Sequence, residues 1–160
     1  MPIVLYRVDE RLLHGQVVVG WGSRLHPARY VIADDELAGS DWEQELYQLT
    51  LGEDAEAEFA TITEARTRLD EWRQDPVRTV LLTRRLASMV ELAEGGALEG
   101  EEVNLGGIHH APGRTAVRSY LHLGEGERDD LRRLAELGVH VMGRELPDST
   151  RVGLDALLNS

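Results

Sequence analysis

Residues 3–33 read IVLYRVDERLLHGQVVVGWGSRLHPARYVIA, and this stretch decides the fold. It begins with an apolar run at 3–8, continues through a segment of helical period at 14–25, and returns to an apolar run at 30–33. Short runs of Val, Ile and Leu predict central strands, and a helix between two such runs is the usual connection between parallel strands. The stretch therefore predicts a β-α-β unit.

The rest of the chain alternates in the same way. Further strands are predicted at 58–61, 78–82, 102–105, 116–121 and 139–144, and further helices at 41–51, 63–74, 85–94, 126–137 and 150–158. This alternation is typical of a three-layer α/β domain, with an open, mainly parallel sheet of about seven strands and helices on both faces. No repeat or long linker interrupts it, so we expect a single domain over residues 1–160.

The helix ends carry their own signals. Thr63, followed by Glu64, is expected to cap the helix at 63–74, and Ser40 or Asp41 is expected to cap the helix at 41–51. Gly138 follows the helix at 126–137 and can adopt the left-handed conformation that ends helices. These residues predict where each crossover begins and ends.

Composition excludes several classes of protein. The net charge of −12 argues against electrostatic binding to nucleic acid or to an anionic membrane. All seventeen basic residues are arginine, so any anion site must use guanidinium groups. No apolar run approaches the ~20 residues of a membrane span, no secretory leader is visible, and cysteine is absent, which fits a cytoplasmic protein. Trp21 is expected in the core, whereas Trp42 and Trp72 fit either a core or an interface.

The loop at 9–14 follows the first predicted strand and contains the candidate catalytic residues. Ligands bind at the carboxyl ends of parallel strands, where unpaired N–H groups of the next helix favour an anion. His14 lies in this loop with Arg11 and Asp9. A neutral imidazole can attack a phosphoryl group if a partner holds its tautomer. From the residues alone, a phosphohistidine and a capping or packing histidine are both open.

A family resemblance bears on this choice. The run Arg7-Val8-Asp9-Glu10-Arg11-Leu12-Leu13-His14-Gly15-Gln16-Val17 resembles the active-site segment of the IIB components of the mannose/fructose/sorbose family of bacterial sugar phosphotransferase systems. The segments at 31–38 and at Val103-Asn104-Leu105-Gly106-Gly107 are similar to the family's second strand with its acidic loop and to its Asn-hydrophobe-Gly-Gly turn. The order of elements matches to the end of the chain, so the resemblance covers the whole domain.

The resemblance implies a cytoplasmic phosphoryl relay. A IIA component would phosphorylate His14 at Nδ1, and the group would then pass to a sugar entering through the membrane proteins IIC and IID. It implies Arg11 as phosphate ligand and Asp9 as its supporting carboxylate, which makes His14, Arg11 and Asp9 the candidate catalytic residues. No cofactor or metal is implied. The oligomeric state usual in the family suggests a homodimer or larger assembly. The resemblance also implies that this assembly is held at the inner face of the membrane through the permease.

A second group of residues is expected to bind or support the phosphate. Two loops carry arginine where the family often has lysine, and both leave the predicted sheet at its carboxyl edge. The supporting candidates are Arg7, Gly15, Gln16, Arg84 and Arg114.

Other interpretations stay open at this point. The domain could accept phosphate as a regulator without moving sugar, or bind an anion without covalent chemistry. The pair His109-His110 invites a metal hypothesis, but adjacent residues in an extended loop point apart and no third ligand is specified. The acidic run Asp34-Asp35-Glu36 fits helix capping and partner recognition better than a cation site. Nothing in the sequence names the sugar.

Overall fold

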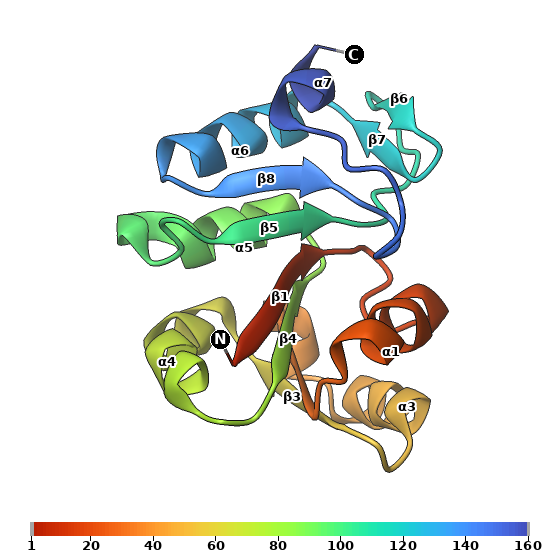
Figure 1. Cartoon of the computed structure of the whole chain (residues 1–160), viewed down its shortest axis with the longest axis vertical. Helices are drawn as coiled ribbons and strands as arrows, with labels where there is room; N and C mark the ends of the chain where they lie inside the picture. The colour runs from red at the N-terminus through yellow and green to blue at the C-terminus, as the bar shows by residue number, and fades with distance from the viewer. Residues whose placement is uncertain (1, 160) are drawn as a thin grey trace.

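The computed structural model describes residues 2–159, and its centre is a six-stranded sheet in which every neighbouring pair of strands is parallel (Figure 1). The strand order is β3-β2-β4-β1-β5-β8. The bounds are β1 Ile3–Val8, β2 Arg29–Ala33, β3 Glu56–Ala60, β4 Thr79–Thr83, β5 Glu102–Leu105 and β8 His140–Gly143. The α/β prediction, with a parallel central sheet and helices on both faces, is confirmed.

Helices cover both faces of this sheet. They are the π-helix η1 (Gln16–Trp21), α1 (Gly22–Leu25), α2 (Asp35–Ala38), α3 (Asp41–Leu51), α4 (Ile62–Gln74), α5 (Leu86–Ala93), the short 3₁₀ turn η2 (Glu94–Gly96), α6 (Glu125–Glu136) and α7 (Leu154–Leu158). No helix within residues 2–159 is long and apolar enough to cross a membrane.

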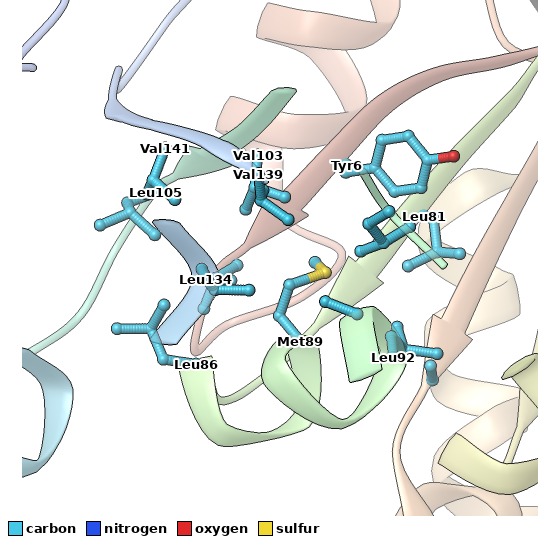
Figure 2. Packing of buried hydrophobic residues seen from close by; sticks show 14 of the residues in the cluster. Tyr6, Leu81, Leu86, Met89, Leu92, Val103, Leu105, Leu134, Val139 and Val141 are labelled. Atoms are coloured by element: carbon cyan, nitrogen blue, oxygen red, sulfur yellow. The ribbon is translucent and has the colours of Figure 1, made fainter. Parts of the chain in front are cut away.

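Two hydrophobic clusters, one on each face, hold the layers together. Along β4, Leu81 packs in one cluster and its neighbours Val80 and Leu82 pack in the other, because side chains alternate across a strand. The first cluster includes side chains of α4, α5, α6 and α7, and Figure 2 shows Met89 of α5 directed at the sheet. The second includes side chains of η1, α2 and α3. Burial on both faces explains why the central strands β1, β2 and β4 are mostly apolar.

The connections after neighbouring strands leave toward opposite faces. The chain leaves β1 for η1, whose side chains join the second cluster. It leaves β4 for α5, and β5 leads on to α6, and both of these helices join the first cluster. The carboxyl end of β1 is therefore a topological switch point, which is where open α/β sheets form their ligand crevices.

Three local expectations need correction. The strand predicted at 116–121 is wrong: the segment is an antiparallel hairpin outside the main sheet, β6 (Thr115–Arg118) and β7 (Leu121–Leu123), because the chain turns between Arg118 and Leu121. The main sheet therefore has six strands. The last helix begins at Leu154 instead of 150, because Val152 is paired with Gly143.

The helix caps are confirmed in part. Thr63 is wrong as the cap of α4: Thr61 is the N-cap, because its hydroxyl accepts from the Glu64 N–H at 3.1 Å while the Glu64 carboxylate accepts from the Thr61 N–H. Ser40 is the N-cap of α3, although its hydroxyl donates to a glutamate side chain. Asp34 caps α2, a short helix that the sequence did not predict.

The tryptophans divide between core and surface. Trp21 is buried as predicted, and Trp72 is buried too. Trp42 is 67% exposed on α3, which places it outside the core.

Candidate active site

The loop at 9–15 joins β1 to η1 and is held from several sides. The Asp9 N–H donates to the Thr83 carbonyl at the end of β4, and the Glu10 N–H donates to the Gly107 carbonyl beyond β5. Leu12 is fully buried and has a positive φ of 56°. A left-handed leucine is uncommon, and here it lets the chain turn while its side chain stays in the core. These hydrogen bonds and the buried Leu12 side chain therefore hold the loop in one conformation.

His14 lies at the end of this loop with its ring only partly accessible. The side chain is 14% exposed, and its Nε2 lies 3.0 Å from Oδ2 of Asp9, although the N–H is not aligned as a hydrogen bond requires. Nε2 is itself buried, so the exposed part of the ring lies elsewhere. No described residue forms a hydrogen bond with Nδ1. The ring therefore turns one nitrogen to the carboxylate and leaves the other free.

Asp9 is the buried centre of the arrangement. One carboxylate oxygen accepts from the Arg11 backbone N–H at 3.1 Å, and the other lies 3.0 Å from the His14 ring and 3.5 Å from Nη2 of Arg7. Burial alone would raise the pKa of this carboxyl, but the contact with His14 and the charge of Arg7 outweigh it and lower the pKa. Asp9 is therefore an ionised carboxylate that is held in place next to the His14 ring.

Arg7 is fully buried beneath this carboxylate. Its Nη1 donates to the Arg144 carbonyl at 2.7 Å and its Nη2 to the Glu145 carbonyl at 2.9 Å, and its guanidinium lies 5.2 Å from the Trp21 ring centroid. Arg7 was expected either to bind the phosphate or to support the site. Its buried position fits the second role, in which it contacts Asp9 and not the phosphate.

The glycines after β5 make room for this buried pair. A Cβ on Gly106 would overlap the guanidinium of Arg7 and the carboxylate of Asp9, whereas one on Gly107 would come within 3.2 Å of Nε2 of His109. The Asn-hydrophobe-Gly-Gly turn is thus part of the site, because only a residue without a side chain fits at Gly106.

Arg11 and Gln16 form the accessible side of the site. Arg11 is exposed, and its Nη2 donates to Oε1 of Gln16 at 3.2 Å. The Gln16 amide in turn donates from Nε2 to Oε2 of Glu145 at 3.3 Å. Sequence reasoning missed Glu145, because nothing near it in the chain indicates a contact with a residue 129 positions earlier.

Gly15 lies at the helix start. A Cβ there would meet nothing within 4 Å, so space is open above it. The first N–H groups of a helix have no partner within it, and none of the hydrogen bonds between described residues uses the N–H of Gly15 or Gln16. The helix start therefore presents free donors beside His14, as an anion site requires.

Arg84 and Arg114 come together in a separate cavity. Arg114 pairs with Oε2 of Glu10 at 3.0 Å and with Glu127 at 3.3 Å, while Arg84 donates to the Tyr47 hydroxyl at 3.4 Å. Both line a cavity of about 110 Å³ that Glu10 also lines. Neither forms a hydrogen bond or ion pair with His14, so these two candidates border the loop through Glu10.

His109 and His110 point in different directions. Nδ1 of His109 lies 3.4 Å from Oε1 of Glu10, whereas His110 meets the ring of His122 edge-on at a centroid distance of 5.8 Å. Within residues 2–159 no group of three His, Asp or Glu side chains is placed to hold a metal ion.

The fold and the site together define a class of protein: a parallel α/β domain that presents a histidine, backed by a buried carboxylate, at the start of its first crossover. The family model described as "PTS system sorbose subfamily IIB component" matches residues 3–160. This chain therefore belongs to that family of IIB components of the sugar phosphotransferase system, as its resemblance predicted. It is a phosphotransferase that carries a phosphoryl group in sugar transport.

Individual relatives agree with this assignment. The N-acetylgalactosamine-specific phosphotransferase enzyme IIB component 1 of Escherichia coli (strain K12) is 29% identical over 150 residues, which cover 91% of each chain. A crystal structure of the N-acetylgalactosamine-specific IIB component 1 from Escherichia coli matches with a TM-score of 0.84 at 29% identity, over 94% of this chain and 97% of that one. The IIB domain of the sorbose permease from Klebsiella pneumoniae has a TM-score of 0.86 over 98% of this chain and 96% of that one, and at 22% identity it supports the fold alone.

Proposed function

We propose that His14 is the phosphorylated residue and that Nδ1 forms the bond to phosphorus. The observation that carries this proposal is the 3.0 Å contact between Nε2 of His14 and the buried carboxylate of Asp9. The negative charge beside that nitrogen favours the tautomer with its proton on Nε2 and leaves a lone pair on Nδ1, which a nucleophilic imidazole needs. The domain is thus loaded by a IIA component, and the phosphoryl group then passes to a sugar at the membrane proteins IIC and IID.

The transfer balances without a cofactor. Nδ1 of His14 attacks the phosphorus of the donor's phosphohistidine, and the donor's N–P bond breaks as the new one forms. Each ring keeps its own proton, so the positive charge that develops on His14 lies against Asp9. In the second step a sugar hydroxyl attacks phosphorus, the bond to Nδ1 breaks, and the hydroxyl proton leaves to a base in the permease's sugar site.

Arg11 and the helix start hold the phosphoryl oxygens in this scheme. The Arg11 guanidinium is exposed and uses only Nη2 for Gln16, so its other N–H donors can face the oxygens. The N–H groups of Gly15 and Gln16 approach from the helix end. Charge on the transferring group is then stabilised by groups already in place.

One experiment tests the proposed function. The protein is incubated with a phosphorylated IIA component of this family, and phosphate on the chain is assayed for stability in acid and alkali. Acid-labile, alkali-stable phosphate on His14 is expected, followed by sugar phosphate when vesicles with IIC and IID are added. Phosphate that forms but never reaches sugar would favour the regulatory alternative, and no phosphate at all would contradict the proposal.

Replacing Arg11 with alanine should slow phosphorylation by roughly 10²-fold, the loss typical of removing one transition-state donor. Folding should hardly change, because the side chain is exposed, and we expect the free energy of unfolding to stay within about 0.5 kcal/mol. Single-turnover kinetics and urea unfolding measure the two effects. The matched control is Arg24→Ala, which removes another exposed guanidinium, on α1, and should transfer at the native rate. Equal rates for Arg11→Ala and the native protein would contradict the role of Arg11.

We also propose that the chain acts in the cytoplasm, at the inner face of the membrane where the permease lies, and that it self-associates. Self-association is supported by three exposed apolar side chains on α3, since Trp42, Leu46 and Leu49 are 67%, 55% and 77% exposed. Their spacing places them along one side of the helix, and contiguous apolar surface is typical of protein contacts. Light scattering should give a mass above that of one chain, reduced to one chain by Leu46→Glu. A monomeric native protein would contradict self-association.

A further inference from the structure

The segment after β8 lies against the helix that follows His14. Gly143 and Val152 exchange two backbone hydrogen bonds of 2.8 Å, so residues 144–151 form a closed loop. The Glu145 carbonyl in this loop accepts from Nε1 of Trp21 at 3.0 Å and from Nη2 of Arg7 at 2.9 Å. Two side chains of the active-site region therefore fix the backbone from which the Glu145 side chain extends.

The Glu145 carboxylate determines which way the Gln16 amide points. An amide has one end that accepts and one that donates, whereas a carboxylate only accepts and a guanidinium only donates. With Nε2 of Gln16 on Glu145 at 3.3 Å, Oε1 is left for Nη2 of Arg11 at 3.2 Å. A reversed amide would set donor against donor at Arg11 and acceptor against acceptor at Glu145.

We propose that Glu145 is a positioning residue for phosphoryl transfer, acting through the Gln16 amide to hold the Arg11 guanidinium in one position at the accessible side of the site. The inference rests on the proposed roles of His14 and Arg11. Arg11 is exposed, and its guanidinium has no hydrogen-bond partner in the described chain other than Gln16. Without Glu145 the Gln16 amide can reverse, so its oxygen is no longer held toward the guanidinium. A charge that must be in position before the reaction is then no longer fixed there.

Single-turnover transfer from a phosphorylated IIA protein tests this role. Glu145→Ala should lower the rate constant at saturating donor about tenfold, as expected for the loss of one hydrogen-bonded support. The donor concentration at half-saturation should not change, because Arg11 acts on the transferring oxygens. Glu145→Gln should stay within about twofold of the native rate, because its amide oxygen still accepts from Gln16. The control Asp148→Ala, in the same loop but paired with Arg24, should leave the rate unchanged.

A double-mutant cycle shows whether the effect passes through Gln16. In a Gln16→Leu background, Glu145→Ala should cause no further slowing, because the connection is already broken. The proposal is overturned if Glu145→Ala transfers at the native rate, if Glu145→Gln is as slow as Glu145→Ala, or if Glu145→Ala slows transfer equally in both backgrounds. A native protein that accepts no phosphate on His14 would instead contradict the proposed function, so the two failures are distinguishable.

Discussion

Replacing His14 with alanine should abolish acid-labile phosphorylation of this chain and leave its fold intact. The bond to phosphorus needs an imidazole nitrogen, and among the described residues no other histidine forms an ion pair with Asp9. The His14 side chain lies at the edge of the site, 14% exposed, so its loss should change the free energy of unfolding by only about 1 kcal/mol. Phosphate incorporation from a phosphorylated IIA protein and thermal unfolding measure the two effects.

The two other histidines near the loop supply the control. His109 and His110 are both exposed, and His109 pairs with Glu10 next to the site. Variants His109→Ala and His110→Ala should accept phosphate at the native rate. If His14→Ala retained full incorporation, or if either control abolished it, the phosphorylated residue would lie elsewhere.

The second large effect is expected for Asp9→Asn. The substitution keeps the shape of the side chain but leaves the buried charge of Arg7 without its carboxylate, and breaking a buried pair in this way costs about 3 kcal/mol. Phosphorylation should slow by roughly 10²-fold to 10³-fold, because an amide can hold the imidazole in the wrong tautomer and does not balance its positive charge. Urea unfolding and single-turnover transfer report the two losses.

The stability loss should depend on pH in a stated direction. The pKa of Asp9 in the folded protein lies below its ordinary value, because the His14 contact and the Arg7 charge outweigh burial. A lowered folded-state pKa contributes stability at pH values above the unfolded pKa of about 3.9, and this contribution is lost as pH falls through the folded value. The difference between native protein and Asp9→Asn should therefore be constant near neutral pH and shrink below about pH 4.

Asp148→Asn provides the comparison for the acid experiment. Asp148 also pairs with an arginine, but its side chain is 84% exposed, so its replacement should change the free energy of unfolding by less than about 0.5 kcal/mol at any pH tested. A difference for Asp9→Asn that stayed constant, or grew, between neutral pH and pH 3 would show that the carboxylate of Asp9 does not stabilise the fold through its charge.

The regular elements could be predicted where local patterns were strong. The strand at 3–8, the strand at 102–105 and the helix at 41–51 agree with the structure at both ends, because an apolar run, an alternating pattern and a helix cap determine them locally. The hairpin at 115–123 was missed because a turn divides an otherwise continuous strand-like run. The cap of α4 was placed two residues late, because either threonine precedes a glutamate and only backbone geometry distinguishes Thr61 from Thr63.

From the sequence, only those residues of the candidate site that lie close together along the chain could be predicted. The loop that carries Asp9, Arg11 and His14 is contiguous, and the family resemblance singled it out. The residues that support this loop are not contiguous in the sequence. Glu145 reaches Gln16 from the far end of the chain, and Gly106 makes room for Arg7 from a different strand.

By itself, the sequence determined the alternation of the six main-sheet strands with their longer helices, the two-sided core and the histidine loop at the first crossover, because these follow from periodicities and motifs within a few turns of chain. Only the tertiary structure decided which nitrogen of His14 faces Asp9, that Arg7 is buried, and that the loop at 144–151 closes on the site. The reason is that these contacts join segments brought together by parallel strand pairing and packing across the sheet, and no local pattern records which distant residues will meet.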